Sequence, residues 1–214
     1  SADRISDITN TKHNLSTTPT TVSRDVQATS ESQICVFCHT PHKAELIPKA
    51  PLWNRKLSGA TYTPYTSSSI DADDIAATPG GTSKLCLSCH DGTIAIGNVN
   101  VLNAQENVSI SMTGTGGGGV MPDGAGANTG FTRKLGTDLR NDHPISFTYD
   151  TNLAIADGEL RDPASESHIA NRTPGIHPQV PLEDNQVQCT ACHDPHIRDV
   201  DITKNIKFLR LNRF

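Results

Sequence analysis

Residues 35–42 read CVFCHTPH, residues 86–90 read CLSCH, and residues 189–196 read CTACHDPH. Each stretch holds two thiols three residues apart, followed directly by a histidine. This pattern is the attachment signature of c-type haem, in which the thiols bond the vinyl groups of the haem and the imidazole binds its iron. The three motifs use all six cysteines of the chain. The sequence therefore predicts three covalently attached haems c.

The residues of these motifs divide into two roles. Those expected to form the thioether bonds are Cys35, Cys38, Cys86, Cys89, Cys189 and Cys192. Those expected to bind iron on the proximal side are His39, His90 and His193. A zinc half-site or a thioredoxin-like redox pair also has two cysteines at this spacing, but neither needs the following histidine. The chain has only nine histidines in 214 residues, so three such histidines are not expected by chance.

The composition does not favour an ordinary protein core. Hydrophobic residues make up 35% of the chain and aromatic residues 4%, against roughly 45–50% apolar residues in a typical domain when glycine is counted. The 16 glycines and 13 prolines favour turns and irregular loops over long periodic elements. We therefore predict one domain over residues 1–214. We expect it to be haem-cored and mostly irregular coil, with short helices at the CxxCH motifs and a few short β-strands.

Local patterns add a few features to this coil. Residues 1–34 are polar and rich in Ser and Thr, so we expect an extended N-terminal segment. Alternating apolar residues within 93–112 predict two short strands forming a hairpin, and residues 145–149 predict a third strand. Residues 113–130 form a glycine-rich loop, whose backbone is too permissive for a regular element. Trp53, the only tryptophan, is either a haem neighbour or part of the ordinary core.

The charge and hydropathy of the chain exclude some partners. The net charge is −5, so no basic field attracts nucleic acid or an anionic membrane surface. No run of 18 apolar residues is present, so no membrane span is expected. Covalent haem attachment takes place outside the cytoplasm, and the chain begins at Ser1 without an initiator methionine. We expect an exported protein, extracellular or at the cell surface, alternatively periplasmic, whose export signal has been removed.

Three irons need three further ligands, and six histidines lie outside the motifs. They are His13, His42, His143, His168, His177 and His196. The chain has only two methionines, so methionine cannot serve all three irons, whereas histidine can. Because methionine ligation raises the potential of a cytochrome c, we expect bis-histidine haems of low potential. His168 and His177 lie in polar loop, where solvation is expected.

Position in the sequence separates the other candidates. His42 and His196 each follow a motif histidine by three residues, so neither can reach the far side of its own haem. Each of them either binds a different haem packed close by, or hydrogen-bonds a propionate or solvent. His143 follows Asp142, and this carboxylate or a backbone carbonyl can fix the tautomer of the ring.

Several stretches together resemble the doubled-CxxCH, cytochrome c3-like family of extracellular multihaem cytochromes. Beside the motifs at 35–42 and 189–196, they are PLWNR at 51–55, LCLSCHDGT at 85–93 and DHP at 142–144. The likeness covers most of residues 12–211. It implies that the distal ligands come from His13, His42, His143 and His196.

The resemblance also implies an assembly. Some members of this family form filaments in which a histidine of one subunit binds a haem of the next. Related chains often continue past a segment like residues 207–210 to a fourth CxxCH motif, whereas this chain ends at Phe214. One candidate distal histidine then lacks a haem in its own chain, or serves a haem of another subunit. A head-to-tail association of identical subunits is expected on this basis.

The expected function is electron transfer through three closely packed bis-histidine haems, without enzymatic activity. The expected partners are identical subunits in a filament, together with other redox proteins or extracellular electron acceptors. A soluble periplasmic triheme shuttle is the alternative. A multihaem reductase would need an iron with an open sixth position, and the available histidines outnumber the irons.

Overall fold

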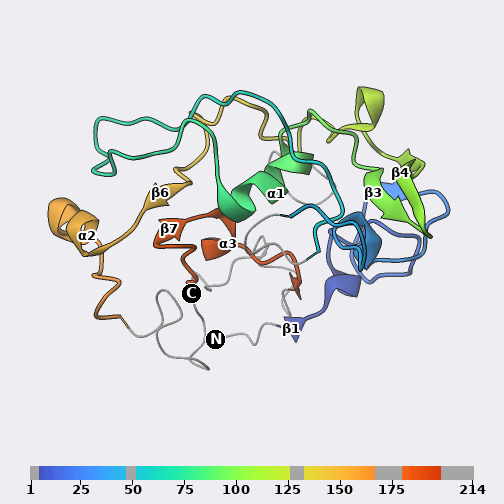
Figure 1. Ribbon diagram of the computed structural model, residues 1–214, viewed down its shortest axis with the longest axis horizontal. Helices are drawn as coiled ribbons and strands as arrows, with labels where there is room; N and C mark the ends of the chain where they lie inside the picture. Colours follow the sequence, from blue (N-terminus) through green and yellow to red (C-terminus); the bar gives the residue numbers. More distant parts are fainter. Residues whose placement is uncertain (1–4, 47–51, 126–132, 167–179, 199–214) are drawn as a thin grey trace.

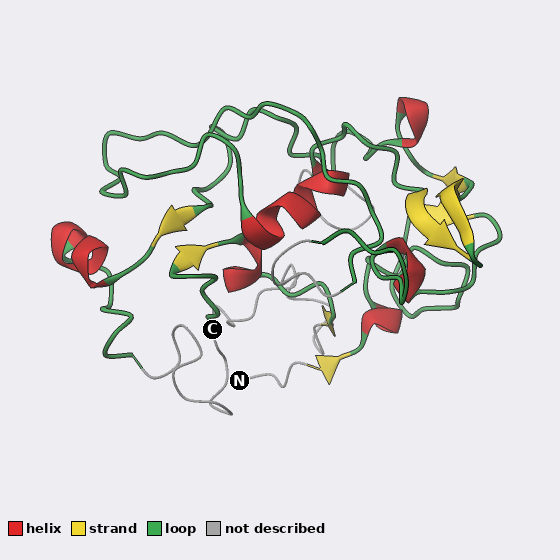
Figure 2. Cartoon of the chain, viewed as in Figure 1, coloured by secondary structure: helices red, strands yellow, loops and turns green. Residues whose placement is uncertain are grey.

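The computed structural model describes residues 5–46, 52–125, 133–166 and 180–198. Short helices and strands are joined by long stretches of coil (Figure 1, Figure 2). The composition predicted short elements of this kind, while a core filled by haem stays a prediction. Of the glycine-rich segment 113–130, the described part reaches residue 125 and contains one helical turn.

Each CxxCH motif includes a helical segment, as the sequence predicted. The first motif starts on the 3-10 helix η2 (Cys35–Phe37), the second closes the α-helix α1 (Gly81–His90), and the third starts on α3 (Cys189–Cys192). The other helices are α2 (Thr151–Asp157) and the 3-10 turns η1 (Ile8–Asn10) and η3 (Gly117–Gly119). Within the described ranges, no helix has the length and apolar character of a membrane span.

Four two-stranded antiparallel ladders connect the coil. They pair β1 (Ile5–Ser6) with β8 (Ile197–Arg198), β2 (Gln27–Ala28) with β5 (Met112–Thr113), β3 (Asn98–Leu102) with β4 (Gln105–Ser109), and β6 (Phe147–Thr148) with β7 (Gln186–Val187). Apart from β3 and β4, the paired strands are far apart in the sequence. These short ladders therefore bring distant segments of the chain side by side.

The β3–β4 hairpin is the regular element that the alternating pattern predicted within residues 93–112. Its register places Val99 opposite Val108. Asn103 and Ala104 make the turn, with φ angles of 49° and 66°, and a type I′ hairpin turn requires this left-handed pair. The predicted hairpin is confirmed, and the predicted third strand is the short β6.

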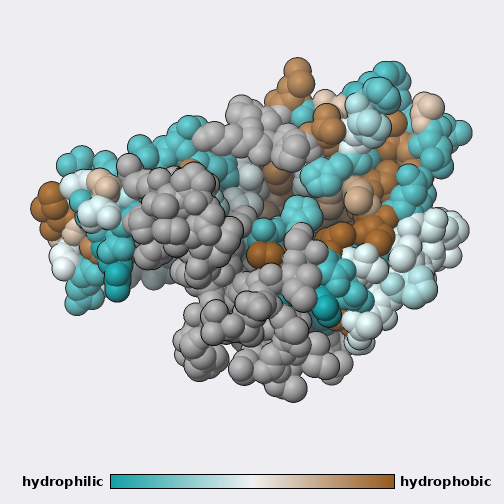
Figure 3. Space-filling model, turned by 90° about the horizontal axis from the view of Figure 1, so that it is seen from below, coloured by the Kyte–Doolittle hydropathy of each residue, from teal (hydrophilic) through white to brown (hydrophobic). Residues whose placement is uncertain are grey.

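Two small apolar clusters include the residues that separate the paired cysteines of the first two motifs. The first cluster consists of Ala28, Val36, Phe37, Val99 and Ile110. The second consists of Tyr62, Leu87 and Leu139. Burial of Phe37 and Leu87 fixes the direction in which the neighbouring thiols and histidine leave the backbone. In the half of the molecule away from α2, apolar residues also gather on the face seen in Figure 3.

Gly114 follows β5 and approaches the backbone before β2 too closely for any side chain. A Cβ atom there would lie 1.6 Å from the carbonyl oxygen of Asp25, and its φ of +73° is left-handed. We expect Gly114→Ala to lower the free energy of unfolding by about 3 kcal/mol, because overpacking adds to backbone strain. Gly124 has a φ of +72° and nothing within 4 Å of such an atom, so we expect Gly124→Ala to cost only about 1 kcal/mol. Denaturant unfolding measures both, and equal losses would contradict the close approach.

Tyr62 and Asp91 form a buried hydrogen bond beside the second motif. The Tyr62 hydroxyl donates to Oδ2 of Asp91 over 2.6 Å, and burial, followed by this bond, raises the pKa of Tyr62 to about 12. An unfolded tyrosine loses its proton near pH 10. In the folded protein Tyr62 keeps its proton to a higher pH than in the unfolded chain. The stability that this protonated form contributes is therefore complete below about pH 10 and is lost as the pH rises towards about 12.

Replacing Tyr62 tests this bond. We expect Tyr62→Phe to lower the free energy of unfolding by about 1–3 kcal/mol at pH 7, because a buried carboxylate oxygen loses its donor. We also expect the variant to lose less stability than the wild type between pH 9 and pH 11. Tyr65→Phe, at a half-buried tyrosine, should keep both the stability and the alkaline slope of the wild type. An unchanged slope in Tyr62→Phe would show that Tyr62 does not titrate as described.

Candidate haem-binding sites

Each of the three motif histidines faces one histidine from outside the motifs. The ring centroids are 6.2 Å apart for His39 and His196, 6.2 Å apart for His90 and His13, and 6.3 Å apart for His193 and His143. No histidine belongs to two of these pairs. We call them the first, second and third histidine pairs, after the motif that each contains.

The separation within each pair fits two axial ligands of one iron. A metal–imidazole nitrogen bond is about 2.0 Å and the ring centre lies about 1.1 Å further, so imidazoles on opposite sides of one ion have centroids about 6.2 Å apart. The angles between the ring planes are 16°, 66° and 24° for the first, second and third pairs. Two imidazoles that share one ion can rotate about their common axis without a change in the distance between their centroids. Rings in direct contact come closer when stacked than when edge-on. The nearly equal distances at very different angles therefore fit a shared ion better than direct ring contact.

A haem iron can take up to two ligands from the protein, and each pair supplies that number. In the described part of the chain, no three side chains of His, Cys, Asp or Glu converge as ligands of a bare metal ion. The number and separation of the paired histidines are compatible with the haems that the motifs predict. None of the six cysteines, all of which are described, is assigned to a disulfide.

Three of the four predicted distal histidines are paired in this way. His196 faces His39 of the first motif and not His193 of the motif next to it. This agrees with the expectation that His196 cannot reach the far side of its own motif's haem. His42 is exposed, and within the described ranges its ring lies against no other ring. His42 as an axial ligand stays a prediction. His168 and His177 lie outside the described residues.

Backbone contacts orient the motif histidine of the second pair. Nδ1 of His90 lies 2.6 Å from the carbonyl oxygen of Arg133, and the carbonyl of His90 accepts a hydrogen bond from the amide of Leu135 over 2.7 Å. The Arg133 guanidinium pairs with the carboxylate of Asp25. With Nδ1 donating to a carbonyl, Nε2 is left as the nitrogen for iron.

The other two pairs show comparable contacts at their distal histidines. Nδ1 of His196 lies 3.0 Å from a carboxylate oxygen of Asp194. Nδ1 of His143 lies 3.4 Å from the carbonyl oxygen of Pro144, so the backbone carbonyl, rather than Asp142, is the partner of this ring nitrogen. Burial raises the pKa of Asp142.

The three pairs lie in one electrostatic neighbourhood. Burial, followed by the nearby rings of His90, His196 and His193, lowers the pKa of His13 to about 3. Burial also lowers the pKa of His90. Both rings of the second pair are therefore neutral at pH 7, the form that binds a metal. Since His13 interacts with one ring of every pair, the sites that these pairs define are adjacent.

The thiols of different motifs also approach each other. Cys86 donates a hydrogen bond to Cys189, and this bond, together with burial, raises the pKa of Cys86. Burial raises the pKa of Cys38 to about 12, with the neighbouring thiol of Cys89 as the next cause. Cysteines of the first and second motifs, and of the second and third, are thus neighbours.

Buried polar side chains hold the first and second motifs together. Nδ2 of Asn54 donates to the carbonyl of Val36 inside the first motif over 2.6 Å and to that of Val101 on β3 over 2.9 Å. The guanidinium of Arg55, only 1% exposed, donates to carbonyls between the second motif and β3. Its acceptors are Ser88, Ala95, Ile96 and Asn98. Trp53 lies next to this segment with its ring edge-on to His39 at 6.3 Å, so it neighbours the first site.

A second set of polar contacts joins the second and third motifs. Oγ of Ser83 on α1 donates to Oε1 of the buried Gln188 over 2.6 Å and accepts from the amide of Cys189 over 3.0 Å. The carboxylate of Glu183 accepts from the amide of Thr82 over 3.1 Å and from Oγ1 of Thr190 over 3.0 Å. These contacts fix α1 against α3.

The sequence did not identify Asn54, Arg55, Gln188 or Glu183 as site residues. The PLWNR stretch was the only signal for the first two, and it came from the family resemblance. Buried polar side chains of this kind look like surface residues in a sequence because their partners are backbone groups of other segments.

No protein-family model matches the sequence, and no curated protein matches it.

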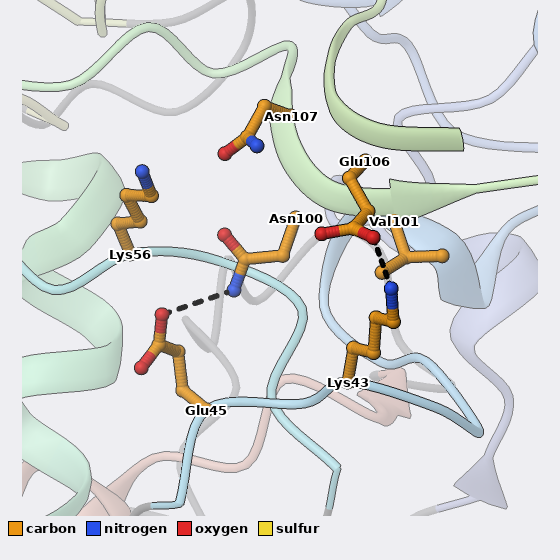
Figure 4. Close-up of a pocket in the computed structure, with 7 residues that line it drawn as sticks. All are labelled: Lys43, Glu45, Lys56, Asn100, Val101, Glu106 and Asn107. Atoms are coloured by element: carbon orange, nitrogen blue, oxygen red, sulfur yellow. Dashed lines mark hydrogen bonds and ion pairs between the residues drawn. The ribbon is translucent and has the colours of Figure 1, made fainter. Parts of the chain in front are cut away.

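A polar pocket of about 170 Å³ lies beside the β3–β4 hairpin and holds none of these site residues (Figure 4). It is lined by Lys43, Glu45, Lys56, Asn100, Val101, Glu106 and Asn107. Lys43 pairs with Glu106 across it, and Nδ2 of Asn100 donates to Glu45 over 3.3 Å. The charges of the pocket are thus largely matched within it.

Proposed function

We propose that this chain is a triheme c-type cytochrome that transfers electrons. The observation that carries the proposal is the set of three histidine pairs, each joining a CxxCH histidine to one other histidine at 6.2–6.3 Å. The six cysteines of the motifs would hold three haems c covalently, and the six paired histidines would bind the irons. When bound, haem supplies one-electron chemistry at iron.

The residues of the chain have three tasks in this proposal. The thiols hold each group in place, and the buried residues inside the motifs orient them. Hydrogen bonds that Nδ1 of His90 and His196 donates would present the opposite ring nitrogen and raise its basicity. The contacts among the motifs keep the three sites adjacent, which supports electron exchange between them.

The same pairs argue against an enzyme. Substrate chemistry at iron needs a coordination position that no protein group occupies. The three pairs would give every predicted iron two histidines of this chain, so no position would be left for a substrate. Electron transfer without bond-making is the function that this ligand set supports best.

The assembly is a separate proposal. In the filament that the resemblance implies, identical subunits would associate head to tail, with extracellular electron acceptors or other redox proteins as further partners. The alternative is a soluble periplasmic shuttle, and one observation favours it: each motif histidine already faces a histidine of the same chain, so no predicted haem would need a histidine from a neighbour. Electron microscopy of the purified protein distinguishes the two, since filaments or single particles would be seen directly.

The cofactor is tested by mass and spectrum. Produced with c-type maturation in an exported form, the chain should carry three haems by mass and show only low-spin bis-histidine iron by electron paramagnetic resonance. A chain that leaves maturation without covalent haem, or that carries methionine-ligated or high-spin iron, would contradict the proposal.

A further inference from the structure

Arg55 places a positive charge between the first and second sites. Its guanidinium is almost completely buried, and its hydrogen bonds go to uncharged backbone carbonyls, at 2.5 Å for Ile96, 3.0 Å for Ala95 and Asn98, and 3.5 Å for Ser88. Ser88 lies between the two cysteines of the second motif. The charge also acts on the thiol of Cys38 in the first motif. Among the described residues, no carboxylate pairs with this guanidinium.

Glu183 places a negative charge at the third site. Its carboxylate accepts hydrogen bonds from Thr190, which lies between the two cysteines of the third motif, and from Thr82 in the first turn of α1. Both donors are uncharged. In the part of the chain that the structure describes, no lysine or arginine pairs with Glu183. Its charge also acts on the thiol of Cys189.

The other charges near the pairs do not cancel this difference. Asp194 adjoins His193 of the third pair and contacts His196 of the first, so it affects both ends alike. Asp91 adjoins His90 and adds a negative charge at the second site, where Arg55 and the paired Arg133 and Asp25 also act. Asp142 adjoins His143 of the third pair. In the described part of the chain, Glu183 and Asp142 at the third site have no buried cation beside them. Arg55 instead acts on the first and second sites, of which the second also has Asp91.

We infer that Arg55 and Glu183 order the reduction potentials of the three sites, with the third site lowest and the first highest. The inference rests on the proposed function. A buried positive charge favours the reduced iron, which carries one positive charge fewer, and a negative charge favours the oxidised iron. One electron entering at the third site would therefore pass downhill through the second to the first, reducing each iron in turn and reoxidising the one before.

The order is measured directly in the haem-loaded protein. A redox titration followed by nuclear magnetic resonance assigns each haem through contacts with the apolar residue inside its motif: Phe37, Leu87 or Ala191. We expect the haem next to Ala191 to be reduced last and the haem next to Phe37 first. The reverse order overturns the inference and leaves the proposed function intact. A chain without covalent haem overturns both.

Charge-removing variants assign the cause. Within about 12 Å, at an effective dielectric constant near 20, one unit charge changes a reduction equilibrium by about tenfold, or about 59 mV for one electron. Glu183→Gln should raise the reduction potential of the third site by this amount. Arg55→Gln should lower the reduction potentials of the first and second sites. The exposed Lys56→Gln and Glu159→Gln are matched controls and should change each equilibrium less than twofold.

Loss of the buried Arg55 contacts can also prevent folding, so one further variant is included and the Glu183 variant is also read alone. Arg55→Lys keeps the charge and should keep the order of the wild type. Glu183→Gln alone tests the negative charge without touching the first motif. If Glu183→Gln leaves the lowest potential unchanged, or shifts all three equally, the inference is wrong.

Discussion

Replacing His13 with glycine should convert one of the three haems from low-spin to high-spin iron. Among the described residues, His13 is the one histidine ring that faces His90, so its removal would leave the predicted iron of this site with one protein ligand. The open position should bind carbon monoxide in the reduced protein, at about one third of the total haem. Electron paramagnetic resonance of the oxidised protein and the carbon monoxide difference spectrum measure the effect.

The matched control is His42→Gly. His42 is a predicted distal ligand of the same family pattern, but its side chain is exposed and has no ring neighbour within the described ranges. The three pairs are complete without it, so His42→Gly should keep three low-spin haems. Added imidazole should restore the low-spin signal in His13→Gly, which separates a lost ligand from a misfolded site. Carbon monoxide binding in His42→Gly but not in His13→Gly would contradict the pairing.

The chain without haem should not unfold cooperatively. Its described apolar clusters contain only five and three buried residues, and the paired rings stand about 6 Å apart, a distance that haem would span. Clusters of this size are too small to offset the conformational entropy of ordering the residues that the structure describes. Produced in the cytoplasm without haem attachment, the chain should give a sloping thermal profile by circular dichroism.

The same chain with three haems is the control for that experiment and should unfold in a cooperative transition. A second comparison uses Cys86→Ser with Cys89→Ser, which removes only the haem of the second motif. Because His13 and His90 lie beside the other pairs, we expect this variant to lose stability throughout the molecule. A haem-free chain with a sharp thermal transition would show that side chains alone fill the core.

The sequence alone suggests the candidate attachment residues because each set lies within five consecutive positions, and attachment itself stays a prediction. The partner of each motif histidine could not be predicted, because distant contacts bring the pairs together. The β1–β8 ladder places residues 5–6 beside 197–198, and the amide of Asp7 donates to the carbonyl of His196 over 2.8 Å. A ladder of two residues leaves no detectable pattern in either strand. The three-residue spacing from His193 excluded His196 as a distal ligand at the third motif, but it did not indicate which of the other two motifs His196 would serve.

The secondary structure likewise includes elements that a local pattern predicts and elements that it does not. Alternation within residues 93–112 predicted the β3–β4 hairpin, while the two-residue strands were too short to predict, apart from β6. The helix α2 has capping residues at both ends that are visible in the sequence. Asp150 caps its first turn by accepting from the amide of Leu153 over 3.0 Å, and Gly158 ends it in a left-handed conformation. Capping residues flanking a seven-residue segment are typical of a short helix.

A density map of the haem-loaded protein that resolves both axial ligands of each iron tests the pairing most directly. We predict that His39 and His196 bind one iron, His90 and His13 the second, and His193 and His143 the third, all from one chain. An iron bound by His42, by a methionine or by a residue of another subunit would contradict it.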